Sequence, residues 1–365
     1  MVNYMKRRWT EREAWEWQEK VGWLRGCNFI GSDCANRIDM WQSSGNAAHM
    51  QTAEREIALC RDMGFNTVRV IVEYDVWLQE RESFLKVLES YISLFAKYNQ
   101  KVIITLANEA VLCRGDIYTP KPLGEQTYAL GYHQGRLPLT PEQKALQPYH
   151  ELERKETRES FLEMIREIVS IYRSDDRVIC WNVFNEPGIT IGVDRSIPLI
   201  KTMFETVREC DPSQPLASDI WYWGDPAHLR PNDRLSADLS DVISWHSYKP
   251  MAEFAEDYSI MKKIGRPILL TEWLNRINHQ EVREMYPLLF LEKINCWCWG
   301  FVAGKTQTYE PWTSLWEQFD AKDGNVRYDF TRWQHDLFRT NLRPYDPKEI
   351  RLIKHFNALA VKHAG

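Results

Sequence analysis

Short runs of apolar residues alternate along this chain with longer segments of helical periodicity. Eight runs have the length and β-branched content of buried strands. They span Trp23–Phe29, Thr67–Val72, Lys101–Leu106, Val178–Phe184, Leu216–Ile220, Val242–Trp245, Pro267–Thr271 and Asn295–Phe301. The segments between them, such as Arg154–Tyr172, carry apolar residues at three- and four-residue steps. Strands that alternate with helices favour a parallel sheet, and eight such repeats predict an α/β chain folded as a (β/α)8 TIM barrel.

We expect residues 1–365 to form one catalytic barrel domain, because barrels of this kind often exceed 250 residues. Residues 1–20 are expected to form a helical extension that caps the barrel floor. The tail from Pro344 onward has helical periodicity and fits the last outer helix. The connection 113–153 follows the third strand and far exceeds the usual length. Such a loop predicts a wall or lid of the functional site.

Charge composition limits the possible partners. Lys and Arg number 46 against 51 Asp and Glu, so the net charge is −5. This balance argues against nucleic acid and against an anionic membrane surface. No window approaches the ~20 uninterrupted apolar residues of a membrane span, and the first twenty residues lack the apolar core of a signal peptide. We therefore expect a cytoplasmic protein, or a secreted one if a leader has been removed. Its oligomeric state stays open.

The cysteines give no metal-binding pattern. The chain has 8 of them, without a CxxC pair and without a His pair at zinc spacing. Cys180, Cys296 and Cys298 lie inside apolar runs, where a free thiol acts as a small hydrophobic group. We therefore expect reduced cysteines, no metal and no cofactor.

Two glutamates stand where apolar runs end. The fourth run ends in Asn185-Glu186-Pro187, and the seventh ends in Thr271-Glu272-Trp273. In a (β/α)8 barrel the carboxyl ends of the strands form the active-site face. Cleavage of a glycosidic bond requires two carboxyl groups, one that protonates the leaving oxygen and one that attacks the anomeric carbon or activates water. This pair therefore indicates a glycosidase.

At these positions the chain resembles the clan of retaining glycoside hydrolases with catalytic glutamates on strands four and seven, and within it the cellulase-like family 5. The motifs that carry the resemblance are Trp181–Pro187, Leu270–Trp273, Gly64–Arg69, His246–Tyr248 and the strand-eight run that ends in Trp299-Gly300. They occur in the clan's order and extend over roughly residues 23–304. The resemblance implies an enzyme that hydrolyses O-glycosidic bonds of an oligosaccharide or glycoside by double displacement.

The resemblance also implies roles for individual residues. Glu186 is expected to be the general acid/base and Glu272 the nucleophile. Asn185 is expected to bind the sugar 2-hydroxyl, and Arg69 to keep the nucleophile ionised. The remaining implied roles are orientation of the nucleophile and contact with substrate by His246 and Tyr248, and a floor for the cleaved sugar by Trp299. Arg69 and Tyr248 should lower the pKa of Glu272, whose negative charge should in turn raise the pKa of Glu186.

Other residues extend the predicted substrate site. Strand three ends in Asn108-Glu109, where many family 5 members carry a His, and we expect these two to contact sugar hydroxyls. The alternative interpretation is that Glu109, and likewise Glu73 after strand two, is a charged residue on the surface. Lys305 and Gln307 follow strand eight and are predicted to bind hydroxyl groups. Aromatic residues that follow the strands, and that are typical of sugar-stacking platforms, are Trp41, Trp77, Trp221, Trp223, Trp273, Trp312 and Trp316.

Several functional alternatives remain at this point. An exo-acting enzyme is favoured, because the long loop 113–153 could close one end of the cleft. An endo-acting cellulase, mannanase or xylanase follows if the loop instead lines an open groove. A metal-dependent or Schiff-base barrel enzyme would need ligand or lysine patterns that the strand ends lack. A non-catalytic carbohydrate-binding barrel would normally lack one of the two glutamates. The sugar and its linkage are not predicted.

Overall fold

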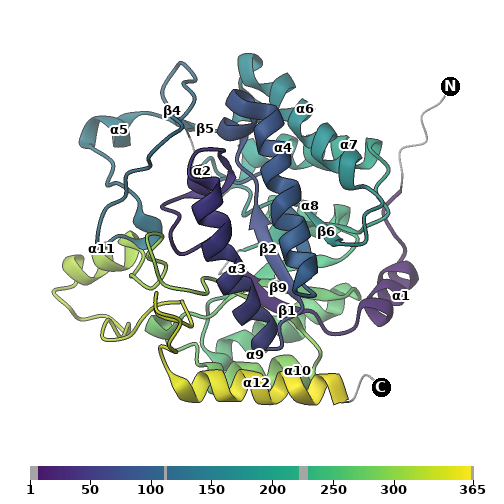
Figure 1. Ribbon diagram of the computed structural model, residues 1–365, viewed down its shortest axis with the longest axis vertical. Coiled ribbons are helices and arrows are strands. Elements are labelled where there is room, and N and C mark those ends of the chain that lie inside the picture. Colours follow the sequence, from purple (N-terminus) through teal and green to yellow (C-terminus); the bar gives the residue numbers. More distant parts are fainter. Residues whose placement is uncertain (1–6, 111–112, 222–228, 363–365) are drawn as a thin grey trace.

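The computed structural model describes residues 7–110, 113–221 and 229–362. In this part of the chain, eight parallel strands close into a barrel in the order β1-β10-β9-β8-β7-β6-β3-β2 (Figure 1). Their bounds are β1 Arg25–Asn28, β2 Thr67–Ile71, β3 Lys101–Thr105, β6 Val178–Phe184, β7 Leu216–Ile220, β8 Ile243–His246, β9 Ile268–Trp273 and β10 Asn295–Cys298. The barrel confirms the predicted (β/α)8 fold.

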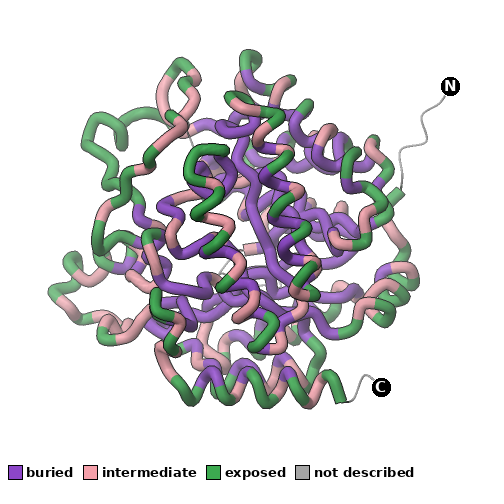
Figure 2. Tube along the Cα trace, in the orientation of Figure 1, coloured by how far each residue is buried: buried purple, intermediate pink, exposed green. Residues whose placement is uncertain are grey.

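Helices surround the barrel, and the strands between them are buried, as Figure 2 shows. The helices are α1 Glu11–Val21, α2 Arg37–Trp41, α3 Asn46–Asp62, α4 Tyr74–Lys97, α5 Pro141–Ala145, α6 Lys155–Tyr172, α7 Val193–Glu209, α8 Pro231–Leu239, α9 Met251–Met261, α10 Val282–Leu291, α11 Thr313–Ala321 and α12 Pro347–Lys362. Strands covered on both faces explain the nearly continuous apolar runs in the sequence. None of the described helices combines the length and the apolar character that crossing a membrane requires.

Helix α1 covers the amino-terminal end of the barrel. It begins with a capping box between Thr10 and Glu13 and ends before Gly22, whose φ of 68° is readily adopted by glycine. Ala14 is fully buried in a cluster with side chains from the strand starts, including Leu24 and Trp297. The helix therefore seals the floor of the barrel and leaves its other end free for a site.

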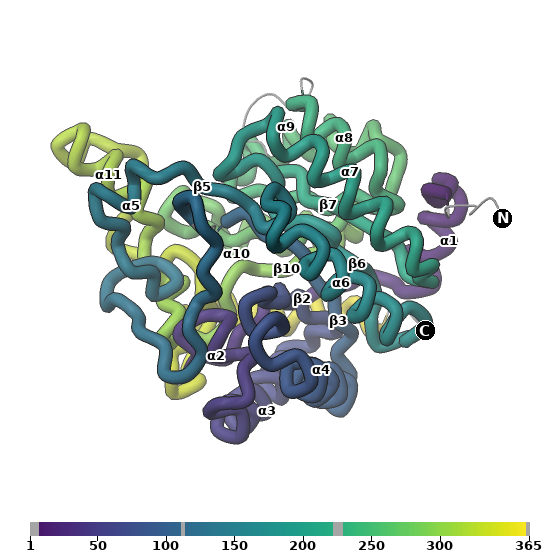
Figure 3. Tube along the Cα trace, turned by 90° about the horizontal axis from the view of Figure 1, so that it is seen from above, coloured from purple at the N-terminus to yellow at the C-terminus, as the bar shows by residue number. Residues whose placement is uncertain are grey.

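The segment between β3 and α6 forms an elaborate wall. It contains the two-stranded pair of β4 Cys113–Arg114 and β5 Pro148–Tyr149, the short helix α5, and the 3-10 turns His133–Gly135 and Glu151–Glu153. In Figures 1 and 3, α5 lies on the same side of the molecule as α11, the helix that follows the last strand, and in Figure 1 it lies above α11. Many residues of the segment between β3 and α6 are exposed, as the green tube in Figure 2 shows. The long loop is therefore folded against the carboxyl-terminal side of the barrel.

Cys27, Cys34, Cys60, Cys180, Cys210, Cys296 and Cys298 are free, and Cys27 Sγ and Cys60 Sγ lie 3.7 Å apart without a covalent bond. Both are fully buried. They pack as small side chains between β1 and α3, which agrees with the apolar setting of cysteines in the sequence.

Gly26 provides a test of the barrel packing. A Cβ at this position in β1 would lie 1.6 Å from the carbonyl oxygen of Thr67. We expect Gly26→Ala to lower the free energy of unfolding by about 3 kcal/mol or more, because a backbone atom cannot move aside as a flexible side chain can. In Gly31→Ala, the new methyl group meets only side-chain atoms, at 3.1 Å and beyond, so the loss should stay below about 1 kcal/mol. Urea unfolding of both variants measures the difference, and equal stabilities would contradict this packing.

Candidate active site

The two glutamates of the sequence motifs lie together at the carboxyl end of the barrel. Glu186 follows Asn185 just beyond the end of β6 and has a φ of 47°, a left-handed conformation that is uncommon for a residue with a side chain. Glu272 lies in β9, where the pairing with both neighbouring strands shifts register. Such irregularities redirect side chains at active sites, and strain there is maintained by the surrounding structure.

The two carboxyl groups are close enough to act on one bond. One oxygen from each, together with a nitrogen of His246, lie within 4.8 Å of one another. Retaining glycosidases hold their carboxyl groups about 5–5.5 Å apart, whereas inverting enzymes need about 6.5–9.5 Å to admit a water molecule. The spacing fits a direct attack by one carboxylate better than attack by an intervening water.

Arg69 in β2 is the centre of the buried polar network. Its Nη1 donates to Glu272 Oε1 at 2.9 Å and to Asn28 Oδ1 at 2.7 Å. Its Nη2 donates to Asp219 Oδ2 at 2.8 Å and to Asn185 Oδ1 at 2.6 Å. The Arg69 side chain has no exposed surface. A cation without solvent needs such partners, because an unpaired buried charge is costly.

Asp219 is a site residue that the sequence analysis missed. It lies in β7 and is fully buried, with Oδ1 accepting from Asn182 Nδ2 at 2.8 Å and also from the Ser244 hydroxyl. Burial alone would raise the pKa of Asp219, but His246 and Arg69 hold it below its ordinary value. The residue was overlooked because Ile220 follows it, so it does not stand where the apolar run ends.

His246 joins three carboxylates. Its Nδ1 lies 2.8 Å from Glu186 Oε1 and 3.5 Å from Glu272 Oε2, and its Nε2 lies 3.3 Å from Asp219 Oδ2. Burial opposes a charged imidazole, yet the carboxylates of Glu272 and Asp219 raise the pKa of His246 to about 10. The imidazole is therefore protonated at neutral pH and can share its proton with Glu186.

Both carboxylate oxygens of Glu272 accept hydrogen bonds from neighbouring side chains. Arg69 holds Oε1, and the Tyr248 hydroxyl donates to Oε2 at 2.6 Å. Burial nevertheless raises the pKa of Glu272 above its ordinary value, with a further contribution from Glu186. The expectation that Arg69 and Tyr248 would leave Glu272 with a lowered pKa is therefore wrong, because loss of solvent outweighs their stabilising effect.

Asn185 and Asn108 form a second pair near the glutamates. Asn185 Nδ2 donates to Asn108 Oδ1 at 2.9 Å. Asn108 Nδ2 is buried and has no hydrogen-bond partner within the described residues. Because buried amide groups are rarely left unpaired, Asn108 Nδ2 is a candidate donor to a sugar hydroxyl.

The position of Glu109 contradicts both interpretations made from the sequence, contact with sugar hydroxyls and a charge on the surface. Its carboxylate is fully buried and accepts from the backbone N–H of Gly188 at 2.9 Å and of Thr190 and Ile191 at 3.4 and 3.3 Å. It therefore cannot be a surface charge, and its oxygens are used by the loop that follows Glu186. Burial raises the pKa of Glu109 to about 7. Its role in this structure is to shape the backbone beside Glu186.

The long loop contacts Trp299 and Trp312 through His133. The sequence analysis also missed this residue. His133 Nδ1 lies 2.8 Å from the carbonyl oxygen of Glu310 and donates to it, which leaves Nε2 as an acceptor. The indole N–H groups of Trp299 and Trp312 lie 3.4 and 3.2 Å from this Nε2. Burial lowers the pKa of His133 to about 3, so the ring stays neutral. One loop residue thus orients two tryptophans.

Gln307 also belongs to this loop contact and not to the open site. Its Oε1 accepts from Gly131 N at 2.8 Å, and its Nε2 donates to the carbonyl oxygen of Ala129 at 2.7 Å. The predicted hydroxyl binding by Gln307 is therefore wrong in this structure, because both ends of the amide hold the loop. Lys305 is exposed beside it.

A cavity of about 690 Å³ opens beside Arg69, whose Nη1 binds Glu272; neither Glu272 nor Glu186 is among its lining residues. Arg69 and Trp299 line its barrel side, and the long loop contributes residues from Arg114 to Leu139. Glu73 also lines it and is paired with Arg37 and Lys121, both at 3.1 Å, so it is not a free surface charge. The volume is that of a pocket for a small molecule.

The predicted aromatic rim is mostly packing. Trp41, Trp77 and Trp273 are buried in the core. Trp221 is partly exposed, donates to the carbonyl oxygen of Pro187 at 3.0 Å and is covered by Arg230. Trp316 is exposed on α11, and Trp223 lies outside the described residues.

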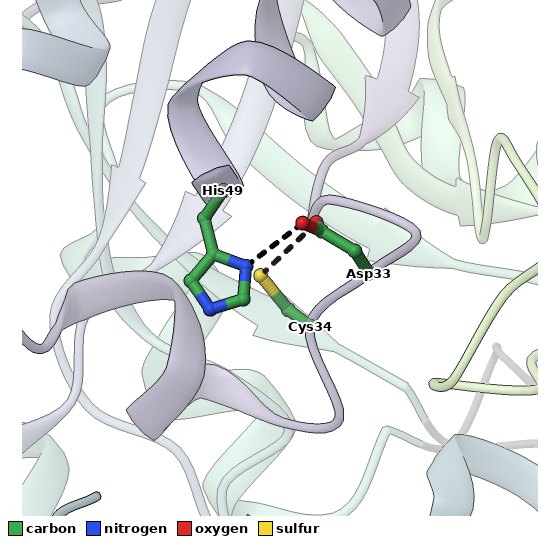
Figure 4. A group of neighbouring side chains, drawn as sticks. All are labelled: Asp33, Cys34 and His49. Atoms are coloured by element: carbon green, nitrogen blue, oxygen red, sulfur yellow. Dashed lines mark hydrogen bonds and ion pairs between the residues drawn. The ribbon is translucent and has the colours of Figure 1, made fainter. Parts of the chain in front are cut away.

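Two groups of side chains among the described residues could hold a metal ion. One is the group of Glu186, His246 and Glu272. The other joins the loop after β1 to α3, where His49 Nδ1 is 3.0 Å from Asp33 Oδ2 and Cys34 Sγ is 3.9 Å from Asp33 Oδ1 (Figure 4). In both groups hydrogen bonds or ion pairs already join the side chains, so neither requires an ion to balance its charges.

Comparison with known proteins agrees with this geometry. The family model described as cellulase (glycosyl hydrolase family 5) matches residues 28–305. No curated protein sequence matches significantly. Among solved structures, the chain is similar to a family 5 mannosidase from Rhizomucor miehei, with 14% identity, a TM-score of 0.57 and coverage of 93% of this chain and 94% of that one.

Two further structures share the fold. An exo-β-1,4-mannosidase from Opitutaceae bacterium strain TAV5 has 13% identity and a TM-score of 0.56 over 93% of this chain, which covers only 60% of that longer protein. A GH5_18 protein from Streptomyces cattleya, in complex with Manβ1-4GlcNAc, has 12% identity and a TM-score of 0.57 over 93% of this chain and 81% of that one.

Asp219 should control the pH range of activity. Asp219→Asn removes a negative charge beside His246, so the pKa of this imidazole should fall from about 10. We expect the alkaline limb of the kcat/KM profile to move down by about one pH unit or more, because the proton shared by His246 and Glu186 is lost earlier. Ser244→Ala removes an uncharged partner of the same carboxylate and should move the limb much less. A lower rate with an unmoved limb would show that Asp219 acts only structurally.

His133 should act through the tryptophans. His133→Ala leaves two indole N–H groups without their acceptor, so we expect kcat/KM to fall about tenfold, mainly through KM. His133→Gln offers a carbonyl acceptor and should recover part of the loss. Since His133 is neutral, the shape of the pH profile should not change in either variant. Steady-state kinetics checks this, and an unchanged KM in His133→Ala would contradict the proposed link.

Proposed function

This chain belongs to glycosyl hydrolase family 5, and from that membership and the site geometry we propose that it is an exo-acting, retaining glycosidase of β-mannosides. The sugar is proposed from the neighbours in structure, which include mannosidases. The retaining mechanism is supported by the short separation of the two carboxyl groups. Exo action is supported by the cavity and its loop wall.

In the first step, the carboxylate of Glu272 attacks the anomeric carbon while Glu186 protonates the departing glycosidic oxygen. The C–O bond to the leaving group breaks, and an ester bond forms between the sugar and Glu272. His246 lies 2.8 Å from Glu186 and holds a proton at neutral pH, so the pair can supply the proton that leaves with the aglycone. Arg69 and Tyr248 keep the attacking carboxylate in place.

In the second step, Glu186 acts as a base. It takes a proton from a water molecule, whose oxygen attacks the anomeric carbon and releases Glu272. Asn185 and Asn108 lie at the ends of neighbouring strands beside the pair and are proposed to bind the sugar hydroxyls. A contact that strengthens as charge develops on the sugar ring lowers the barrier of both steps.

The observation that supports exo action is the cavity that the long loop walls beside Arg69 and Trp299. Residues from Arg114 to Leu139 line one wall and residues from Asn28 to Met40 line another. A polysaccharide chain needs a groove that is open at both ends, whereas a cavity of about 690 Å³ suits a short oligosaccharide.

Endo action is the alternative, and product analysis separates the two. Hydrolysis of β-1,4-mannohexaose by an exo-acting enzyme releases mannose and mannopentaose first. Early release of mannobiose, mannotriose and mannotetraose together would show internal cleavage and would refute the proposed closure of the cleft.

The roles of the two glutamates can be distinguished with activated substrates. Glu272→Ala should abolish turnover of a nitrophenyl glycoside, and azide should partly restore it because a small anion can occupy the vacated space. Glu186→Gln should lose at least about 10²-fold on a natural disaccharide and much less on a dinitrophenyl glycoside, whose leaving group needs no proton. Full activity of Glu272→Ala, or an equal loss on both substrates in Glu186→Gln, would refute the assignment. Nitrophenol release measures all of these rates.

A further inference from the structure

The wall of the cavity carries more positive charge than the rest of the molecule. Its lining includes Arg37, Arg114, Lys121 and Arg136 in addition to Arg69, against the two acidic residues Glu73 and Asp336. The whole chain has a net charge of −5. A concentration of cations on one cavity wall of an acidic protein favours ligands of negative charge.

Arg136 has the least compensated of these charges. It lies in the long loop and is reached by solvent through the cavity that it lines. Within the described residues its guanidinium donates to the side-chain oxygen of Gln134 and forms no ion pair with a carboxylate. Its guanidinium stays charged at neutral pH, because arginine is not deprotonated in proteins.

Arg37 and Arg114 add further donors to the same wall. Arg37 uses only its Nε to bind Glu73, at 3.1 Å, and Arg114 donates from Nη1 to the carbonyl oxygen of Leu146 at 2.9 Å. No carboxylate pairs with Arg114 in the part of the chain that the structure describes. Lys121 differs from them, because its ammonium group is shared by Glu73 and Asp75. The uncompensated charge is thus that of Arg114 and Arg136.

We infer that this wall is a subsite for an anionic group on the substrate, so that the preferred substrate is an acidic oligosaccharide carrying a carboxylate, phosphate or sulfate group beside the cleaved bond. Planar guanidinium groups bind such oxyanions through paired hydrogen bonds. Neutral sugar hydroxyls would not require two arginines without carboxylate partners. The inference rests on the proposed glycosidase function and adds the charge of the substrate to it.

The position of Arg136 places the anion near the reacting bond. Arg136 lines the same cavity as Arg69, which binds Glu272, and as Trp299, proposed as the floor of the cleaved sugar. A bound anion would offset the repulsion between Arg136 and Arg37. Binding should therefore be strongest for substrates whose negative group lies on one of the two sugars joined by the cleaved bond.

The first experiment compares matched disaccharides on the intact enzyme. The probes are β-1,4-mannobiose and derivatives in which C6 of either ring is a carboxylate or carries a phosphate or sulfate. We expect at least one anionic derivative to have a KM about tenfold or more below that of neutral mannobiose. Raising the ionic strength from 0.02 to 0.5 M should increase this KM and leave that of the neutral sugar nearly unchanged. If only one of the three kinds of derivative, carboxylate, phosphate or sulfate, has the lower KM, that result identifies the anion that the wall binds.

The second experiment assigns the advantage to the wall. Arg136→Ala should remove most of it, Arg136→Lys should retain part because the charge stays without the paired geometry, and Arg136→Ala with Arg114→Ala should abolish it. Arg327→Ala is the control, since Arg327 is an exposed arginine paired with Glu253 away from this cavity. Anionic derivatives that bind no better than neutral mannobiose, or an advantage that survives in the double variant, would overturn the inference.

A binding measurement separates this inference from the proposed function. Calorimetry on Glu272→Gln with mannuronate, glucuronate and galacturonate, each beside its neutral parent sugar, needs no turnover. If no mannobiose is cleaved, the proposed sugar is wrong. The anionic subsite then stands if a uronate binds more tightly than its parent and loses this preference in Arg136→Ala. The inference of an anionic subsite is overturned if no uronate binds more tightly than its parent sugar and loses this preference in Arg136→Ala.

Discussion

The buried guanidinium of Arg69 is the interaction on which the active site depends. It lies without solvent among side chains from β1, β6, β7 and β9, and it contacts Glu272 and Asp219 directly. Removing one partner from a buried ion pair typically costs about 3–5 kcal/mol, so the network favours a single arrangement. Four strands that are far apart in sequence are thereby held so that one carboxylate faces the space above the barrel.

The same network divides the roles of the carboxyl groups. Asp219 is paired with Arg69 and His246, and these two cationic neighbours keep it ionised although burial opposes its charge. Its charge holds a proton on His246, and His246 in turn contacts Glu186. Both oxygens of Glu272, the proposed nucleophile, are held by Arg69 and Tyr248. A buried aspartate thus connects the position of the proposed nucleophile with the proton that the proposed mechanism delivers to the leaving group.

The sequence predicts those elements that repeat a pattern and those residues that stand where a pattern ends. Eight apolar runs identify the strands, and Glu186 and Glu272 are found because they stand where two runs stop. Asp219 interrupts a strand without ending it, so the same rule passes over it. His133 and the contacts of Glu109 and Gln307 depend on how the loop after β3 folds back, and no local pattern encodes a contact between residues 133 and 299. The pKa of Glu272 could not be predicted either, because the sequence shows its charged partners but not the extent of its burial.

The account depends most directly on a covalent bond between the sugar and Glu272. The decisive measurement uses 2-deoxy-2-fluoro-β-mannosyl fluoride, whose glycosyl-enzyme should form readily and hydrolyse slowly. Mass spectrometry of the digested protein should find one added fluorosugar, located on Glu272. Modification at another residue, or rapid turnover to the inverted product without any adduct, would contradict the retaining mechanism and the place of Glu272 within it.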